Sequence, residues 1–365
     1  MKQLIAVFLC IIMLAMTTAC GGNSSDQANQ DPQNNNQSNS EENSSEELPI
    51  LGVSIYSAAD NFVSYIGQSI SNTSKGIFQV NVEDGQNDQT NQLNQVDTMI
   101  ARGAKVIALA LVDTTAAPAV IEKAKEAGNL PVIFFNNKPD DKDLLSYDNV
   151  YFAGNTGSDW GAIIQGEMVA KAFKENPEFD KNGDGKIQLV NIMGDPGHAA
   201  TAPRAEYAKK AINDAGLEYE LLAEDTGMWA TANAKDKMDA WISKFGDEIE
   251  FIITANDAMA LGALTSIQAV GYNTEGADSE KYIPIIGIDA LPEILSKIET
   301  GEVQGSVLQD ARTQGEVVVK MAANLANGKD PLDGMDGFTL DESKCVDVPY
   351  KAIDISNIEE AKAGY

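Results

Sequence analysis

Polar side chains that can form paired hydrogen bonds follow most of the expected β-strands. Asp, Asn, Gln and Arg carry planar groups, each of which can bond to neighbouring hydroxyl groups. Aromatic residues in similar positions offer flat apolar surfaces to the C–H faces of a pyranose ring. A hexose is a ligand of this kind. The residues at these positions are Asp60, Asn61, Phe62, Asn136, the loop from Gly194 to His198 with Arg204 beyond it, Met228, Trp229, Asn256, Asp257, Asp289, Gln309 and Asp310.

Each of these residues alone has an ordinary structural explanation. Asp and Asn after strands are more often turn formers or helix caps, and a single Phe or Trp is more often part of the core. The hypothesis of a binding site depends on the repetition of one chemical theme in many loops. In parallel sheets, ligands bind beyond the carboxyl ends of the strands, which is where these residues stand.

A second group of oxygen-bearing residues lies in segment 180–188, which reads DKNGDGKIQ. It fits the first nine positions of an EF-hand calcium loop, with glycine at position six and a backbone carbonyl at position seven. Position twelve is Asn191 instead of glutamate, and a strand is expected after the loop instead of a helix. A plain Asp/Asn/Gly turn is therefore the alternative. The expected donors are the side chains of Asp180, Asn182, Asp184 and Gln188 and the carbonyl of Lys186.

The composition excludes several classes of function. The 365 residues include 55 acidic and 26 basic side chains, so the net charge is −29. We expect no nucleic-acid partner, because phosphate binding depends on clustered Lys and Arg. His198 is the only histidine, which excludes zinc motifs of the H-E-x-x-H type.

The N-terminal residues predict export and a lipid anchor. The apolar run 4–16 (LIAVFLCIIMLAM) is shorter than the roughly 20 residues that span a bilayer, so residues 1–19 are expected to be a signal peptide. Cys20 follows small residues, as in the bacterial lipoprotein cleavage box, although Thr17 stands where Leu is usual. We expect a lipid on Cys20 at the outer face of the cell membrane; a chance cysteine is the alternative. Residues 20–47 predict a disordered tether.

From about Leu48 onwards, short β-branched runs alternate with segments of helical period. This alternation predicts an α/β fold of parallel sheets covered by helices on both faces. The strands are too many for one sheet of ordinary size, so we expect two doubly wound lobes with a cleft between them. The expected strands are 50–56, 79–83, 106–112, 132–136, 187–193, 250–254, 283–288 and 303–308, with helices such as 116–127 and 236–244.

Seven long segments resemble the bacterial galactose/glucose-binding proteins, a family of periplasmic sugar receptors for ABC importers. The similarity runs from about residue 51 to residue 354. The segments are DNF (60–62), QNDQTNQLNQVDTMIARG (86–103), VIFFNNKP (132–139), GDPGHAATAPR (194–204), MWATANAKDKMDAW (228–241), ANDAMALGA (255–263) and GIDALPE (287–293).

The resemblance implies roles for the candidate residues. Phe62 and Trp229 would sandwich the sugar ring. The residues that would hydrogen-bond to its hydroxyl groups are Asp60, Asn136, His198, Arg204, Asn256 and Asp289. Glu250 would complete the calcium site as a bidentate ligand from a distant strand. Ala200 stands where the family has an aspartate, and Gln309 where it has an asparagine. These two differences bear on which sugar is preferred.

The resemblance also implies a type I periplasmic binding protein fold, in which a three-strand hinge joins two discontinuous lobes. The expected N-terminal lobe comprises 48–155 and 310–344, and the C-terminal lobe comprises 156–309 and 345–365. Crossings are expected near Thr156, Asp289 and Asp310. The expected partners are a monosaccharide and the membrane subunits of an ABC permease, with a chemoreceptor as a further candidate, and the protein is expected to be a monomer.

Three other functions are alternatives to a carrier that catalyses no reaction. A sugar hydrolase is the first, because a chain with 55 acidic residues can supply a carboxylate pair, although neither G-x-S-x-G nor G-x-x-x-x-G-K-[ST] occurs in the sequence. A sugar sensor for a chemoreceptor without transport is the second. A transcription regulator with the same two-lobe core is disfavoured by the signal peptide and by the lack of a basic helix-turn-helix segment before the core.

Overall fold

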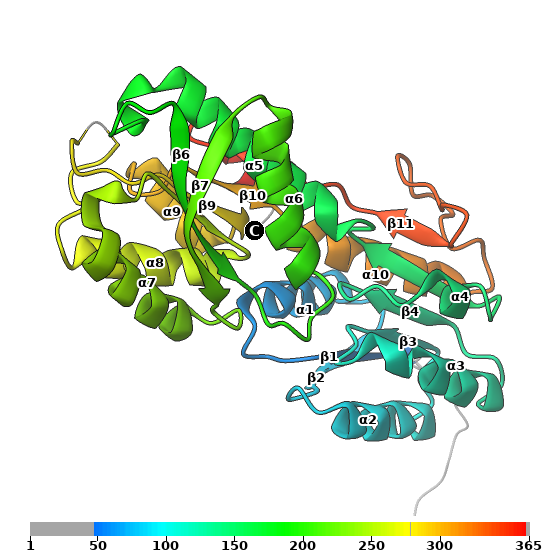
Figure 1. Ribbon diagram of the computed structural model, residues 1–365. Helices are drawn as coiled ribbons and strands as arrows, with labels where there is room; N and C mark the ends of the chain where they lie inside the picture. Colours follow the sequence, from blue (N-terminus) through cyan, green and yellow to red (C-terminus); the bar gives the residue numbers. More distant parts are fainter. Residues whose placement is uncertain (1–46, 278, 363–365) are drawn as a thin grey trace, which may run out of the picture. The chain divides into compact units, whose positions relative to one another are not determined.

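Two six-stranded sheets form the framework of the folded chain (Figure 1). The computed structural model describes residues 47–277 and 279–362. The predicted signal peptide, Cys20 and the tether up to residue 46 lie outside these residues. Within the described range, no helix is both long and apolar enough to cross a bilayer.

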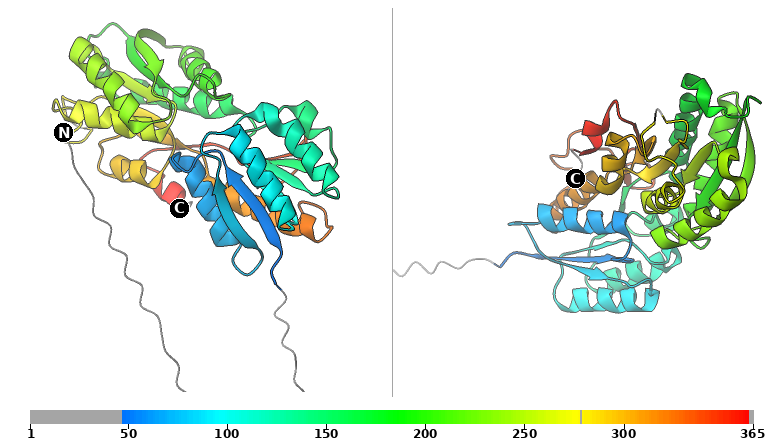
Figure 2. Two further views of the ribbon diagram at one scale, coloured as in Figure 1. Left: turned by 90° about the horizontal axis from the view of Figure 1, so that it is seen from below. Right: turned by 90° about the vertical axis from the view of Figure 1, so that its left-hand side faces the viewer.

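The first sheet is parallel throughout and has the strand order β11-β5-β4-β3-β1-β2. Helices α1 and α10 cover one face and α2 and α3 the other (Figures 1 and 2). A short helix, α4, precedes β5. The strands are β1 (Ile50–Ile55), β2 (Gln79–Asp84), β3 (Val106–Leu109), β4 (Val132–Phe135), β5 (Val150–Gly154) and β11 (Cys345–Asp347), and the helices are α1 (Asn61–Thr73), α2 (Gln89–Ala101), α3 (Ala117–Glu126), α4 (Asp141–Leu144) and α10 (Ala311–Ala326).

The second sheet has the order β12-β10-β9-β8-β6-β7 and is parallel except for β12, which runs antiparallel to β10. Helices α5 and α6 pack on one face, and α7, α8 and α9 on the other. The elements are β6 (Lys186–Met193), β7 (Glu218–Thr226), β8 (Phe251–Thr254), β9 (Ile285–Asp289), β10 (Gly305–Leu308), β12 (Lys351–Ile353), α5 (Ser158–Glu175), α6 (Thr201–Asp214), α7 (Thr231–Phe245), α8 (Asp257–Gln268), α9 (Pro292–Glu299) and α11 (Ile358–Lys362).

The predicted fold class is confirmed, and burial accounts for several of the strands that the sequence reveals. Strands β3, β4 and β8 are buried at every position, so they read as continuous apolar runs. Strand β7 lies at a sheet edge and is half exposed. Its sequence, EYELLAEDT, mixes polar and apolar residues, and the sequence analysis did not identify it. Strands β5, β11 and β12 were also missed, the last two because each has three residues.

The chain crosses between the lobes at three places: between β5 and α5, between β10 and α10, and between β11 and β12. The predicted lobe boundary between residues 344 and 345 is wrong, because Cys345–Asp347 pairs with Phe152–Gly154 in the first sheet. The predicted crossing near Asp289 is also wrong. Strands β9 and β10 are neighbours in the second sheet, so the chain stays in that lobe.

Side-chain hydrogen bonds connect the crossing segments. The backbone N–H and the hydroxyl of Thr156 both donate to Asp347 Oδ1, at 2.9 and 2.8 Å. Asn155 donates from Nδ2 to the carbonyl of Val348 and accepts from Gln314 Nε2 at 2.8 Å. These bonds connect the segment after β5 to the end of β11 and to the first turn of α10.

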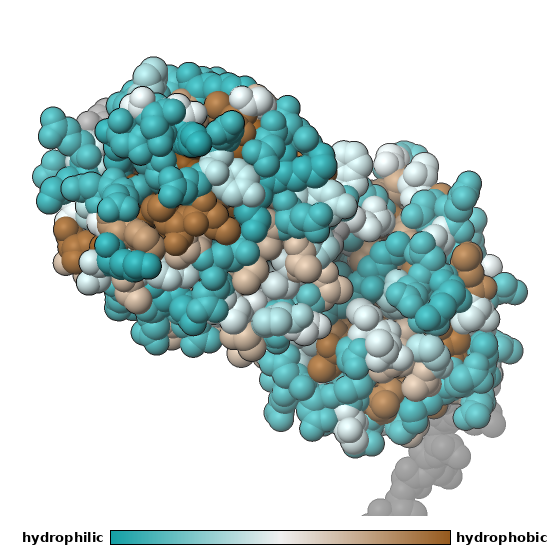
Figure 3. All heavy atoms as spheres, in the orientation of Figure 1, coloured by the Kyte–Doolittle hydropathy of each residue, from teal (hydrophilic) through white to brown (hydrophobic). Residues whose placement is uncertain are grey.

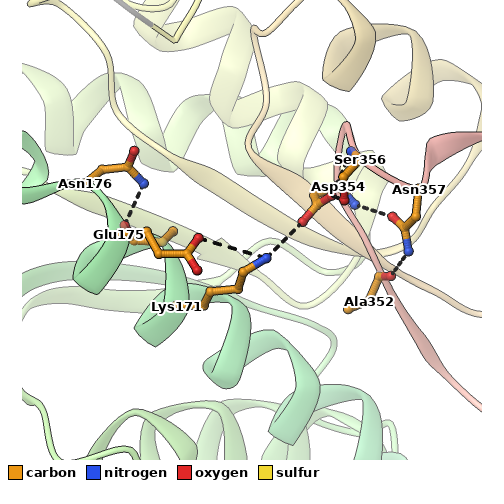
Figure 4. Close-up of polar contacts among 8 residues, drawn as sticks. Lys171, Glu175, Asn176, Ala352, Asp354, Ser356 and Asn357 are labelled. Carbon is orange, nitrogen blue, oxygen red and sulfur yellow. Dashed lines mark hydrogen bonds and ion pairs between the residues drawn. The ribbon is translucent and has the colours of Figure 1, made fainter.

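The C-terminal segment is attached to α5 by polar contacts (Figure 4). Lys171 Nζ lies 3.5 Å from Asp354 Oδ2, and Asn357 Nδ2 donates to the carbonyl of Ala352 at 2.9 Å. Asn357 Oδ1 in turn accepts from the backbone N–H of Asp354. The ion pair is largely exposed and contributes little, so the segment depends mainly on buried Ile353 and Ile358.

The face shown in Figure 3 is mostly hydrophilic, with hydrophobic residues in small separate groups. Such scattering is ordinary for a protein surface in water. Leu145, Trp160 and Ile355 are among the large hydrophobic residues that are more than half exposed.

A close helix contact in the second lobe gives a testable prediction. A Cβ added at Gly166 of α5 would overlap the carbonyl oxygen of Ala208 in α6 and lie 2.7 Å from Ala211 Cβ. We expect Gly166→Ala to lower the free energy of unfolding by about 1–3 kcal/mol, measured by urea denaturation.

Gly67→Ala in α1 is the matched control. Its new Cβ would lie 3.3 Å from Val82 Cγ1, which belongs to a side chain that can shift, and alanine favours the helix by about 1 kcal/mol. An unchanged or higher stability is expected. Equal losses in both variants would contradict the assignment of the α5–α6 contact.

Candidate functional site

All nine predicted sugar-site residues line one pocket, together with Tyr56. Four of the ten come from the first lobe and six from the second. Tyr56, Asn136 and Gln309 directly follow strands, and Asp289 ends one. The others lie in the loops or first helical turns that come after strands, because the carboxyl ends of parallel strands meet at one edge of each sheet. The first lobe supplies Tyr56, Asp60, Phe62 and Asn136, and the second supplies His198, Arg204, Trp229, Asn256, Asp289 and Gln309.

Tyr56 is the lining residue that the sequence analysis missed. The expected strand 50–56 ends on Tyr56, whereas β1 ends at Ile55. The Tyr56 hydroxyl donates to Asp60 Oδ2 at 2.6 Å. Burial and the neighbouring Asp60 raise the pKa of Tyr56 well above its usual value, so the hydroxyl keeps its proton. Its position at the carboxyl end of the first strand is the sequence feature that could have identified it as a lining residue.

Asp60 and Asn256 are both helix N-caps and pocket residues, two roles that the sequence analysis gave as alternatives. Asp60 Oδ1 accepts from the Val63 N–H at 3.0 Å and begins α1. Asn256 Oδ1 accepts from the Met259 N–H at 3.0 Å and begins α8. Both residues are N-caps and line the pocket as well. Capping therefore fixes the direction of these side chains.

Arg204 is buried in the pocket with a partly satisfied guanidinium group. Nη1 donates to the carbonyl of Ala255 at 2.6 Å, and Nη2 donates to Gln309 Oε1 at 2.9 Å. Nε is buried and has no hydrogen-bond partner among the described residues. The guanidinium carbon lies 5.7 Å from the centre of the Trp229 ring. A donor without a partner is the kind of group that a hydroxyl-rich ligand can satisfy.

His198 is neutral in this site. Burial lowers its pKa to about 4, with a further lowering by Arg204. Nδ1 accepts from the backbone N–H of Ala200 at 3.2 Å, which leaves the proton on Nε2. Nε2 therefore donates to Asn137 Oδ1, 2.9 Å away in the other lobe. The imidazole also packs edge-on to the Trp229 ring, with ring centres 5.1 Å apart.

Left-handed backbone occurs at three lining residues. The φ angles are 58° at Asn136, 61° at Trp229 and 124° at Asp289. Such conformations are unfavourable for side-chain-bearing residues and are often found at functional sites. The Trp229 ring lies so close to Gly194 that a Cβ there would overlap it, so the absent side chain of Gly194 makes room for the tryptophan.

The cavity between these side chains is small, with a volume of about 30 Å³. That is roughly the space of one water molecule. A ring-sized ligand can enter only if side chains or lobes separate. The bonds between Arg204 and Gln309 and between His198 and Asn137 are the polar contacts that it would replace.

Ala200 does not line the pocket. It precedes α6 as its N-cap residue, and its backbone N–H donates to His198. Ala200 therefore bears on the site through its backbone bond to His198.

The predicted calcium ligands lie close together around one loop and Glu250. Both carboxylate oxygens of buried Glu250 accept backbone N–H groups, from Lys181 at 2.7 Å and from Gln188 at 3.2 Å. Asp180 Oδ1 accepts from the Asp184 N–H at 3.1 Å, and Gly185 adopts a φ of 76° in the turn. Gln188 Oε1 is buried without a hydrogen-bond partner among the described residues.

The donor set suits a hard cation, but the acidic groups are bonded to the loop. Within the described residues, no three His, Cys, Asp or Glu side chains are grouped closely enough to hold a metal ion. Calcium also takes amide and backbone oxygens, which Asn182, Gln188 and Lys186 offer in this loop. Binding would require the carboxylates of Asp180, Asp184 and Glu250 to exchange backbone N–H partners for the ion.

His198 is the only histidine, so its titration can be followed without interference. Its pKa falls from 6.5 in the unfolded chain to about 4 in the folded protein, so between these values only the unfolded chain takes up the proton. Stability should therefore fall as the pH drops from 7 to 4, by up to about 3 kcal/mol. We expect denaturation curves of the His198→Asn variant to lack this component. An imidazole NMR signal that titrates near pH 6.5 in the folded protein would contradict the assignment.

Several named binding proteins are similar to this chain. It is 42% identical over 311 residues to the D-galactose/methyl-galactoside binding periplasmic protein of Haemophilus influenzae, which covers 84% of this chain and 90% of that protein. It is 29% identical over 282 residues to a putative rhizopine-binding protein of Rhizobium meliloti, covering 76% and 85% of the two chains. A crystal structure of an ABC transporter solute binding protein from Bacillus halodurans with bound myo-inositol matches with a TM-score of 0.70 and 28% identity, covering 87% of this chain and 99% of that chain.

The named relatives are binding proteins, in agreement with the prediction of a carrier instead of an enzyme. The profile of the periplasmic binding protein domain matches residues 51–330, which include nearly all of both sheets. On this match and the 42% identical relative, the chain belongs to the periplasmic binding protein family.

Proposed function

We propose that this protein binds an aldohexose in the cleft and delivers it to the membrane subunits of an ABC importer. D-galactose or a methyl-galactoside is the proposed ligand. The observation that carries the proposal is the pocket itself, in which amide, carboxylate and guanidinium groups lie together with the aromatic side chains of Tyr56, Phe62 and Trp229. A relative that is 42% identical and is named for galactose and methyl-galactoside binding supports the choice of sugar.

The chemistry of binding follows from the contacts among the lining residues. Arg204 Nε lacks a partner, and Arg204 Nη2 is bonded to Gln309. Sugar hydroxyl groups can accept from the guanidinium and donate to the carboxylates of Asp60 and Asp289. Phe62 and Trp229 would cover the apolar faces of the ring. Each polar group that loses its present partner would gain a sugar hydroxyl in its place.

Movement at the crossing segments would admit the sugar and then close the lobes over it. His198 and Asn137 form a hydrogen bond between the lobes, so the contacts of the closed form include residues from both sides of the cleft. We propose that the membrane subunits recognise this closed form, and that a chemoreceptor is a second candidate partner. We also propose that a lipid on Cys20 holds the protein at the outer face of the membrane, as the residues before Cys20 indicate.

Trp229→Ala tests the proposed sugar site. Removal of the indole ring should cost about 2–4 kcal/mol of binding free energy, because a buried aromatic contact is lost. That corresponds to an affinity roughly 30- to 1,000-fold weaker. The measurement is calorimetric titration with D-galactose, methyl-galactoside, D-glucose, xylose and ribose.

Trp160→Ala is the matched control, because Trp160 is 64% exposed and does not line the pocket. Its sugar affinity should equal that of the wild type. If Trp229→Ala binds every sugar as the wild type does, Trp229 is not part of the site. If the wild type binds none of them, the proposed ligand class is wrong.

We further propose that loop 180–188 and Glu250 bind a structural calcium ion. The buried Gln188 Oε1 without a partner, the buried carboxylate of Glu250 and the oxygen-rich loop support this proposal. Bound calcium would hold the loop to the start of β8 and neutralise part of the local negative charge.

Calcium should raise the melting temperature through preferential binding to the folded state. We expect melting several degrees higher in millimolar calcium than in excess chelator, with galactose affinity nearly unchanged. Glu250→Gln should melt at the same temperature in both buffers. Identical melting of the wild type in calcium and in chelator would overturn the calcium proposal.

A further inference from the structure

The backbone that carries Asp289 into the cleft is strained over two consecutive residues. Asp289 ends β9 with a φ of 124°, and Ala290 follows with a φ of 53°. Neither residue is glycine, so both conformations are unfavourable on their own. Such a turn persists only where its surroundings hold it in place.

Two buried residues outside the pocket lining hold this turn. Ser306, in β10, donates from Oγ to Asp257 Oδ1 at 2.7 Å and accepts the backbone N–H of Ala290 at 3.1 Å. Asp257 Oδ2 accepts the backbone N–H of Leu291 at 2.9 Å. The two N–H groups that follow Asp289 are therefore bonded to side chains, and the serine and the aspartate are bonded to each other.

Asp257 also contacts Asp289 itself. It lies in the first turn of α8 with no exposed surface, and its backbone N–H is hydrogen-bonded to the Asp289 carboxylate. A Cβ added at Gly287 in β9 would overlap Asp257 Oδ1, so the glycine leaves space for this carboxylate beside the strand. One residue thus holds the backbone after Asp289 and the carboxylate of Asp289.

The pKa values of these two buried carboxyl groups are both raised. Burial raises the pKa of Asp257 to about 7, although hydrogen bonds from Ser306 and Leu291 oppose the rise. Burial and the nearby Asp257 also raise the pKa of Asp289, whereas Arg204 lowers it. A second buried carboxyl group destabilises a fold unless it is well bonded. Its presence directly behind a lining residue indicates a role in the site.

We propose that Asp257 and Ser306 are positioning residues for ligand binding, which hold the turn at 289–291 and aim the Asp289 carboxylate into the cleft. This inference rests on the proposed sugar binding. Neither residue lines the pocket, so each acts through Asp289.

A double-mutant cycle on binding tests the proposal. Ser306→Ala should weaken D-galactose binding about tenfold in the wild-type protein and less than twofold in the Asp289→Ala background. Ser306→Thr, which keeps the hydroxyl, should restore most of the affinity. A purely structural serine would change the affinity by the same factor in both backgrounds, and that result would overturn the proposal.

Ser266→Ala is the matched control. Ser266 is also a buried serine bonded to an aspartate, with Oγ donating to Asp239 Oδ1 at 2.5 Å, but it lies at the far end of α8. We expect this variant to keep the wild-type sugar affinity. A loss equal to that of Ser306→Ala would also overturn the proposal, because it would show a general effect of lost stability.

Amide hydrogen exchange separates this inference from the proposed function. Without sugar, Ser306→Ala and Asp257→Asn should each exchange the amides of Ala290 and Leu291 at least tenfold faster than the wild type, relative to amides in β6. Unchanged exchange would overturn the inference even if galactose binds. If the wild type binds no sugar, the proposed function fails. Faster exchange in the two variants would still show that Asp257 and Ser306 stabilise the turn at 289–291.

Discussion

The parallel direction of the strands is the constraint on which the whole cleft depends. Because every strand except β12 runs parallel to its neighbours, the residues that follow the strands of each sheet collect at one edge. Helices begin at the same edge, so Asp60 and Asn256 cap α1 and α8 and line the cleft at once. The groups that begin the helices are therefore also the groups that can meet a ligand, and the site needs no separate scaffold.

Polar groups that the sheets gather in this way bond to one another at the cleft. Arg204 bonds to Gln309, His198 to Asn137 and Tyr56 to Asp60, because buried polar groups without partners are costly. The contacts leave a cavity of about 30 Å³. In the proposed mode of binding, ligand entry exchanges these hydrogen bonds and separates the walls of the cavity by movement at the three crossing segments.

Unfavourable backbone occurs at several residues of the cleft and is supported from behind it. Trp229 has a left-handed backbone, and its ring occupies the space that the absent side chain of Gly194 leaves free. Asp289 depends in the same way on hydrogen bonds from the layer beneath it. At Trp229 and Asp289, buried hydrogen bonds and packing in the adjoining core offset the conformational energy of the unfavourable backbone, and this backbone sets the direction of the two side chains.

The sequence by itself determined the α/β class, most of the buried strands and the nine candidate residues, because apolar runs and the residues after them are local features. It did not reveal β7, whose edge position leaves it half exposed, or Tyr56, which looked like part of a strand. Only the tertiary structure decided that β11 joins the first sheet and that the chain does not cross at Asp289. It alone showed the support of Asp289 by Asp257 and Ser306. Strand pairing and buried hydrogen bonds join residues far apart in the chain, and such contacts leave no periodic signal in the sequence.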